Sequence, residues 1–414
     1  MRIVAISNLY PPNVIGGYEL FAERVARGLR RRGHAVTTLT TAGPLPGAED
    51  DAVERCLWLA DVYRPSPWPG GQPALDHAAR VSCYANIDRV AAALRRLRPE
   101  LVLLHNPLGL GVLGLIDLLD EIGVGWLWLL GDKIPAQALA DLPPDVAALF
   151  RCAHRRSFAG GSFVSVSSTL LHEIRTAGIE LGPNVEVVPC WCEPVPPGPR
   201  PPHRGPLRCV ATGQIGREKG IHLIVAAAAA LARRPGPPVT IDVQGAGELA
   251  HYATLARAEG ADEIIRFHGF RPHGELVELY RRSDVFLFPS RTREPFGLAH
   301  QEAAAEGCAV VMTRGGSSER FVDGVHCLKI DRTVPALLEA IERLARDRDL
   351  AAALGRRAAA LVRGGLAEAR LLPRLEAPLA AAVRPLDWDR VDWARILRLA
   401  LYKDRLAQER AAAA

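Results

Sequence analysis

Two glutamates, Glu294 and Glu302, stand eight positions apart in the stretch EPFGLAHQE. An apolar run, VFLFPS, precedes them, and a helix is predicted to begin near Phe296 and Gly297, with Pro295 where a helix start tolerates it. Glu294 then lies beside the positive end of the helix, and Glu302 about one and a half turns into it. Because carboxylates accept hydrogen bonds from vicinal hydroxyls, the pair suits a sugar and a ribose joined by a diphosphate. Two capping or solvated acids are the alternative.

Two basic residues suit a diphosphate at a second position, in VATGQIGREKGIHLI (210–224). A strand is predicted to end at Gly213 and a helix to begin after Lys219, so Arg217 and Lys219 lie beside the amides of a helix start. Cations and such amides together stabilise phosphate oxygens. A solvated loop with common basic residues is the alternative.

A third candidate is the glycine pair in NVIGGYELFAERV (13–25), which follows the first predicted strand. Gly16 and Gly17 carry no Cβ, so the backbone can turn tightly and approach a ligand at the positive end of the next helix. The pattern is not GxGxxG, and no acidic residue ends the next strand, which argues against a nicotinamide cofactor. An ordinary strand-to-helix turn is the alternative.

The elements that must position these residues alternate between short apolar runs and helical patterns. The predicted strands are RIVAIS, AVTTLTT, LVLLH, WLWLL, FVSVS and VEVVP in the first half, and LRCVATG, VTIDVQG, IIRFHG, VFLFPS and AVVMT in the second. Such alternation predicts parallel sheets covered by helices. We therefore expect an α/β protein of two doubly wound, Rossmann-like domains facing a central cleft, with ligands beyond the carboxyl ends of the strands.

A proline-rich stretch, CEPVPPGPRPPHRGP (192–206), divides the chain, since its seven prolines prevent a helix or a central strand. We predict an N-terminal domain over 1–193, a linker over 194–206, a C-terminal domain over 207–384 and a helical tail over 385–414. The sequence allows this tail to pack back on the N-terminal domain. The tail has an apolar face at helical spacing, made of Trp393, Ile396, Leu397, Ala400 and Leu401.

Composition excludes several classes of protein. No apolar run reaches the roughly 18 residues of a membrane span, and MRIVAISNLY lacks the regions of a signal peptide. Residues 1–193 carry 18 Lys and Arg against 20 Asp and Glu, and residues 207–414 carry 31 against 26. Neither half is basic enough to indicate nucleic acid. Eight scattered cysteines without a CxxC pair predict a reducing cytoplasm and no zinc site.

Several of these stretches together resemble family 4 glycosyltransferases of the GT-B fold, in order and in spacing. The resemblance covers nearly the whole chain up to about residue 365, and its second half is the more specific. The stretches that carry it are GGYELFAERVARGLRRRGHAV, LVLLHNPLG, GQIGREKGIHLI, VQGAGEL, HGF, SDVFLFPSRTREPFGLAHQEAAAEGCAVV and GGSSERFVDG.

The resemblance implies roles for individual residues. His105 should lie beside the transferred sugar, Lys219 should meet the pyrophosphate and Glu294 the sugar hydroxyls, and these three are the expected catalytic residues. Glu302 should bind the ribose. The other expected donor-binding residues are Gly16 and Gly17 at the cleft, Gln214 and Arg217 near the diphosphate, Phe296, Gly297 and Leu298 through their backbone amides, and Gly245, Phe270 and Arg271 beside the nucleobase.

The chain departs from the family pattern at three places. Gln214 stands where the family usually has Arg, and Arg217 is the residue available to compensate. Gly131-Asp132 stands where many members have His-Asp, and CWCE (190–193) where many have Asn-Gly-Val-Asp. The last two changes lie on the acceptor or hinge side, so they bear on the acceptor more than on donor chemistry.

The implied activity is a retaining transfer from a nucleoside-diphosphate sugar to a hydroxyl of a glycan, a lipid-linked acceptor or a small natural product. A front-face attack, with the departing phosphate taking the acceptor proton, needs no metal and no other cofactor. The Asp387–Asp389 DWD triplet lies at no predicted strand end and resembles a metal motif only superficially. A nucleotide-sugar epimerase of related fold and a non-catalytic sugar-nucleotide-binding protein are the alternatives.

The expected location is the cytoplasm. Weak peripheral binding to the inner membrane surface, through the basic run RVARGLRRRGH (24–34), stays a hypothesis.

Overall fold

The computed structural model describes residues 1–43, 45, 50–60, 81–192, 196, 198, 205–290 and 294–413. Contacts divide the chain into two compact units. Unit 1 consists of Met1–Val188 and Leu372–Ala414, and unit 2 of Pro189–Leu371. Most of the predicted linker lies outside the described residues. Residues 372–384, which were assigned to the C-terminal domain, group with unit 1.

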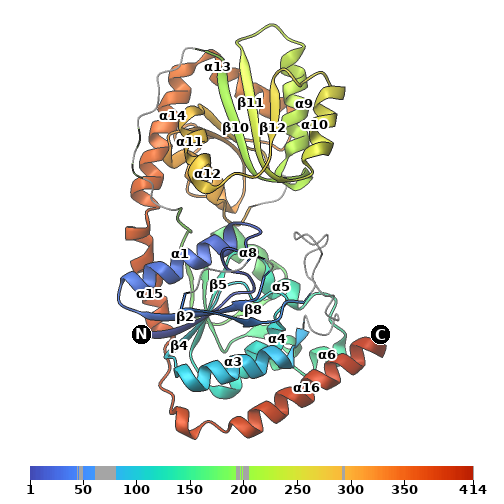
Figure 1. The fold of residues 1–414 in the computed structure, drawn as a ribbon, viewed down its shortest axis with the longest axis vertical. Coiled ribbons are helices and arrows are strands. Elements are labelled where there is room, and N and C mark those ends of the chain that lie inside the picture. The colour runs from blue at the N-terminus through green and yellow to red at the C-terminus, as the bar shows by residue number, and fades with distance from the viewer. Residues whose placement is uncertain are drawn as a thin grey trace. The chain divides into compact units, whose positions relative to one another are not determined.

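Unit 1 is built, in its described part, on a seven-stranded parallel sheet (Figure 1). The strands lie in the order β3 (Val53–Leu57), β2 (Ala35–Thr41), β1 (Arg2–Ile6), β4 (Leu101–Leu104), β5 (Trp126–Leu130), β7 (Ser162–Ser165) and β9 (Val185–Val187). Strands β6 (Ser157–Phe158) and β8 (Glu180–Leu181) form a separate pair. The order runs outward in both directions from β1 and β4, so the topological switch point lies between these two strands.

The helices of unit 1 connect these strands. They are α1 (Gly17–Arg31), α3 (Tyr84–Leu97), α4 (Val112–Ile122), α5 (Ile134–Ala138), α6 (Pro144–Ala147), α7 (Arg151–His154) and α8 (Ser168–Thr176). Strands β4 and β5 are buried at every residue. Their continuous apolar sequences, LVLL and WLWLL, fit a parallel sheet that is covered on both faces.

Unit 2 repeats this architecture with a six-stranded parallel sheet in its described part. The strands lie in the order β12 (Ile265–His268), β11 (Val239–Gly247), β10 (Leu207–Ile215), β13 (Val285–Phe288), β14 (Ala309–Thr313) and β15 (Cys327–Ile330). The switch point lies between β10 and β13. All eleven predicted strand segments are present, whereas the edge strands β3 and β15 and the pair β6 and β8 were not predicted.

The main helices of unit 2 are α9 (Ile221–Ala232), α10 (Leu249–Ala258), α11 (His273–Arg282), α12 (Leu298–Ala305), α13 (Val334–Arg346) and α14 (Arg348–Ala360). Shorter turns are η1 (Arg217–Lys219), η2 (Gly316–Ser318) and the π-helical η3 (Leu361–Gly365). Strands β13 and β14 are buried throughout; α12 packs on both strands and α14 packs on β14.

The chain returns to unit 1 within α15 (Glu368–Ala382), from Leu372 onward. Turn η4 (Trp388–Arg390) leads to α16 (Trp393–Ala413), which packs on α3, α4 and α6 (Figure 1). Ile396 and Ala400 of the predicted apolar face are buried. Lys403 Nζ lies 2.7 Å from Asp117 Oδ2 on α4 and pairs with it.

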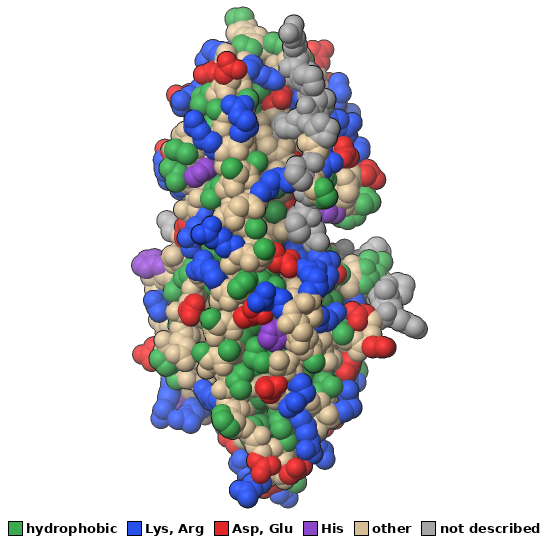
Figure 2. All heavy atoms as spheres, turned by 90° about the vertical axis from the view of Figure 1, so that its left-hand side faces the viewer, with side chains coloured by type: hydrophobic (Ala, Val, Ile, Leu, Met, Phe, Trp, Pro, Cys, Tyr) green, Lys and Arg blue, Asp and Glu red, His purple; other side chains and the backbone are tan. Residues whose placement is uncertain are grey.

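The surface carries mixed charge. On the face shown in Figure 2, Lys and Arg side chains are scattered among acidic and apolar ones. No helix within the described ranges is long and apolar enough to cross a membrane.

Candidate active site

Two loops meet at the switch point of unit 2. One follows β10 and carries Lys219 on η1, and the other follows β13 and carries Glu294. Gly220 has a φ of 76°, and a Cβ there would collide with the carbonyl oxygen of Pro289. The left-handed conformation and this close approach both require glycine. Glycine at this position therefore lets the first loop lie close against the second.

Lys219 and Glu294 form an ion pair across these loops. Lys219 Nζ lies 2.5 Å from Glu294 Oε1. The lysine side chain is 33% exposed and the glutamate side chain 12% exposed, so the pair stands at the edge of the sheet and is not sealed in the core. The Glu294 carbonyl accepts a hydrogen bond of 2.8 Å from the Ser317 amide, which fixes the backbone of the second loop.

Ser290 is a buried residue that supports Glu294. Its Oγ lies 2.8 Å from Glu294 Oε1 and 3.1 Å from the Glu218 carbonyl oxygen, so its hydroxyl proton is shared between two acceptors. Its own carbonyl accepts hydrogen bonds from Thr313 Oγ1 at 3.0 Å and from Arg332 Nε at 3.1 Å. Lys219 and Ser290 therefore both contact the same oxygen of Glu294.

The helix that follows the second loop begins where it was predicted. Helix α12 starts at Leu298 with Gly297 as its N-cap, directly after Phe296. A Cβ on Gly297 would lie 2.5 Å from Nδ1 of the buried His300, so glycine is needed for packing here. The first amides of a helix have no partner within the helix and point toward its start. The start of α12 therefore comes shortly after Glu294 in the chain.

Glu302 lies on α12 with its side chain 11% exposed. Its Oε2 is 3.9 Å from His273 Nδ1, at the start of α11. The buried Tyr280 lies behind it, with its hydroxyl 2.7 Å from Thr212 Oγ1. Burial, followed by the charge of Glu302, raises the pKa of Tyr280 above its usual range. Tyr280 therefore stays neutral and can donate a hydrogen bond near Glu302.

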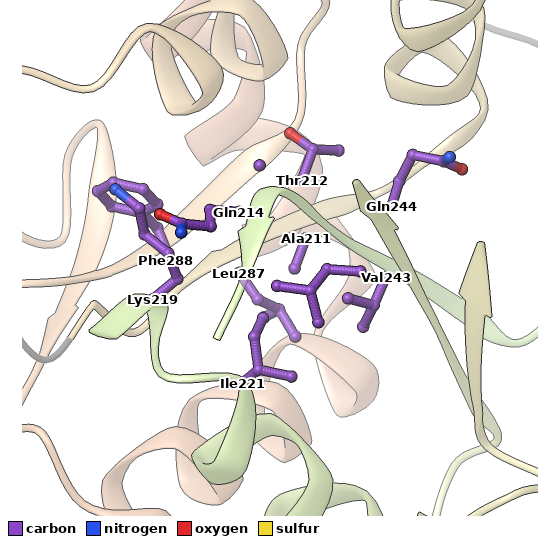
Figure 3. Close-up of a pocket in the computed structure, with 11 residues that line it drawn as sticks. Ala211, Thr212, Gln214, Lys219, Ile221, Val243, Gln244, Leu287 and Phe288 are labelled. Carbon is purple, nitrogen blue, oxygen red and sulfur yellow. The ribbon is translucent and has the colours of Figure 1, made fainter. Parts of the chain in front are cut away.

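The other expected donor residues of unit 2 surround the carboxyl ends of β10 and β11. A hollow is lined by Gln214, Lys219 and Phe288 on one side and by Val243 and Gln244 on the other (Figure 3). Gly245 pairs with Gly213 in the ladder, and a Cβ on Gly245 would collide with the Gly213 carbonyl. Arg217 and Gln214 are exposed. Further along the edge, Phe270 is 78% exposed and Arg271 pairs with Glu275 at 3.4 Å.

The expected residues of unit 1 lie at its own switch point. A Cβ on Gly16 would meet nothing within 4 Å, so the backbone is open at this point. The buried Glu19, on the first turn of α1, accepts hydrogen bonds from the amides of Gly16 at 2.8 Å and of Ile15 at 3.2 Å. Burial raises the pKa of Glu19. The carboxyl group of Glu19 thus occupies two amides at the place where a ligand was expected to approach the glycine pair.

His105 directly follows β4 and is 1% exposed. Both ring nitrogens are buried without a hydrogen-bond partner in the described part of the chain. Burial lowers the pKa of His105 to about 3, so the ring is neutral near pH 7. Its carbonyl accepts from Trp128 Nε1 at 3.1 Å and lies 2.9 Å from the Tyr18 hydroxyl.

Two family models account for most of the chain. A "Glycosyl transferase 4-like domain" matches residues 16–191, and "Glycosyl transferases group 1" matches residues 203–361. The second match contains Lys219, Glu294 and Glu302. The chain belongs to the group 1 glycosyltransferases.

Relatives and solved structures agree with this assignment. The glycosyltransferase is 28% identical to glycogen synthase of Mycobacterium tuberculosis over 78% of this chain and 81% of the relative. It is 32% identical to D-inositol 3-phosphate glycosyltransferase of Corynebacterium urealyticum, over 43% of this chain and 45% of the relative. The crystal structure of Anabaena HepE with UDP and glucose matches 92% of this chain and 100% of its own, with a TM-score of 0.66 at 16% identity. The last likeness shows the GT-B fold.

Sequence reasoning missed two residues that the structure places in this glycosyltransferase's candidate site. Ser290 ends the run VFLFPS, and its place after a buried strand was the available signal. Tyr18 follows the glycine pair, and nothing in its spacing indicates the strands that its hydroxyl reaches. Among the described residues, no group of three His, Cys, Asp or Glu side chains could hold a metal ion.

Proposed function

We propose that this glycosyltransferase moves a sugar from a nucleoside-diphosphate sugar to a hydroxyl-bearing acceptor, with retention at the anomeric carbon and without a metal ion. The observation that supports it most is the Lys219–Glu294 pair at the switch point of unit 2, 2.5 Å long and partly exposed. Glu302 stands on the helix that follows. A cation, a helix start and two carboxylates along one sheet edge match the parts of such a donor.

In the proposed reaction the bond between the anomeric carbon and the β-phosphate oxygen breaks. The acceptor oxygen bonds to that carbon from the same face, and its proton passes to the departing phosphate oxygen. Lys219, Arg217 and the first amides of α12 stabilise the charge that develops on the leaving group. Lys219 leaves its ion pair with Glu294 and binds the pyrophosphate. Glu294 stays hydrogen-bonded to Ser290 and accepts hydrogen bonds from the sugar hydroxyls.

The remaining residues take supporting roles in this proposal. Glu302 accepts from the ribose hydroxyls, and Gly245, Phe270 and Arg271 border the nucleobase. His105 acts as a neutral group behind the transferred sugar. Contact between its ring and the sugar requires a local movement in unit 1, since both ring nitrogens are buried.

A donor and acceptor panel tests the proposal. Protein is incubated with UDP-glucose, GDP-mannose or ADP-glucose, with and without glycogen or inositol 3-phosphate, and nucleoside diphosphate and sugar products are measured. We expect nucleoside diphosphate release that depends on an acceptor and survives EDTA, and a product with the donor's anomeric configuration. Free or epimerised sugar without acceptor dependence would indicate an epimerase. Nucleotide binding without turnover across a widened panel would indicate a binding protein.

A further inference from the structure

Tyr18 and Gly131 form a close pair at the carboxyl edge of unit 1. A Cβ built on Gly131 would lie 2.6 Å from Tyr18 Cε2 and 2.7 Å from its Cζ. The φ of Gly131 is outside the left-handed region, so the backbone conformation does not require glycine there. The ring of Tyr18 therefore occupies the space that a side chain at position 131 would need.

The ring cannot easily give way, because its hydroxyl is fixed to the ends of two strands. The Gly131 amide donates to Tyr18 Oη at 2.8 Å. The hydroxyl in turn lies 2.7 Å from the Leu129 carbonyl and 2.9 Å from the His105 carbonyl, so its proton is given to one or the other. Tyr18 thus links α1 to the ends of β4 and β5.

The pair lies where a ligand is expected. Tyr18 is partly exposed and follows Gly16 and Gly17, at the switch point between β1 and β4. Here the ring of Tyr18, whose hydroxyl is already paired with backbone groups, fills the space that a side chain at position 131 would need. An aromatic face of this kind packs against apolar surface and offers no charge.

We propose that Tyr18 is a specificity-determining residue of the acceptor site and takes the place of the side chain at position 131. It presents its ring face to the C–H face of a neutral saccharide acceptor. This proposal rests on the proposed function, because it requires transfer to an acceptor, and it assigns the binding of that acceptor to unit 1.

The test is a double-mutant cycle of Tyr18→Ala and Gly131→His, with Tyr18→Phe as the matched control. The acceptor KM is measured with glycogen as the varied acceptor, and the donor is the one in the panel that the wild-type protein uses. We expect Tyr18→Ala to raise the acceptor KM about tenfold, with UDP affinity unchanged because the nucleotide residues lie in unit 2. Tyr18→Phe keeps the ring face, so its acceptor KM stays near the wild-type value, although its melting temperature falls.

The cycle also separates the packing from the chemistry. Gly131→His alone should lower the melting temperature, and adding Tyr18→Ala should recover most of that loss, because the histidine then fills the vacated space. Unchanged acceptor KM in Tyr18→Ala, with active wild type, would overturn this proposal alone. Additive losses of stability in the double variant would overturn the claim that the two side chains share one space. Wild type without any turnover would overturn the proposed function and this proposal with it.

Discussion

The carboxyl edges of the two sheets share one topology and differ in chemistry. In unit 2 the loops after β10 and β13 place Lys219 and Glu294 in contact, with the lysine side chain 33% exposed. In unit 1 the loops after β1 and β4 carry polar groups that are satisfied internally or buried. Glu19 caps two amides of the glycine loop, and His105 is buried and neutral.

This difference indicates how each edge can bind. An ion pair at a partly exposed edge can exchange one partner for a charged ligand at modest cost, because solvent screens the groups during the exchange. An edge whose polar groups are buried or already paired within the protein offers a ligand mainly its shape and the faces of its rings. The diphosphate is therefore proposed to bind at unit 2, and a neutral acceptor at unit 1.

Removing the cation of unit 2 should have the largest effect. We expect Lys219→Ala to lower transfer about 10²–10³-fold, the usual loss when one group that stabilises developing charge is removed. Steady-state turnover with saturating donor measures it. Arg346→Ala, which removes an exposed cation on α13 paired with Glu342, is the control and should leave turnover unchanged. A loss below about fivefold in Lys219→Ala would remove the basis for assigning the leaving group to this edge.

The two units should both lose stability in acid, through one buried histidine each. Burial lowers the pKa of His105 in unit 1 and of His300 in unit 2 to about 3. An unfolded histidine titrates near pH 6.5, so below that pH the unfolded chain binds a proton that the folded chain refuses. Stability is complete above about pH 6.5 and falls by roughly 2 kcal/mol per histidine by pH 5.

His300→Phe separates the two contributions, because His300 packs between Phe288 and Phe321 with ring centroids 5.1 and 5.2 Å away. Urea unfolding at pH 7.5 and pH 5 should show a smaller acid loss in the variant than in wild type. Identical losses in the two proteins would mean that the histidine of unit 2 is protonated in the folded state.

The support beneath Glu294 should contribute less than Lys219. We expect Ser290→Ala to lower turnover about tenfold. The variant loses a hydrogen bond to a charged group, which is worth about 1.5–3 kcal/mol, while Lys219 still contacts Glu294 Oε1. Nucleoside diphosphate affinity should not change. Thr254→Ala on the surface of α10 serves as the control. A loss of nucleotide affinity in Ser290→Ala would show that Glu294 also contacts the nucleotide.

The same contrast explains which parts were predictable from the sequence. The strands and the charged residues of unit 2 follow from local patterns, since apolar runs mark the strands and charges stand out after them. Ser290 and Tyr18 do not, because their roles depend on atoms far away in the chain, such as the carbonyl of Leu129. The short edge strands β3 and β15 carry polar residues and lack a continuous apolar run. Helix α15 contains Pro373 and Pro378, which local rules place outside helices.

Removing metal ions should have the smallest effect. We expect transfer in EDTA to match transfer without it, because Lys219, Arg217 and helix amides supply the positive charge in this account. Turnover of one donor before and after chelation measures it. Loss of activity that manganese restores would show that unit 2 needs an ion at the diphosphate.

Calorimetry of nucleoside diphosphate binding to Glu302→Ala and Glu294→Ala tests the central claim most directly. Glu302→Ala removes ribose contacts and should weaken UDP or GDP binding by about 1.5–3 kcal/mol. Glu294→Ala should keep or improve that affinity, because it frees Lys219 from its ion pair, while its transfer rate falls. Equal losses of nucleotide affinity in both variants would contradict the division between ribose and sugar. Unchanged affinity and turnover in both would mean that the two glutamates only support helix α12.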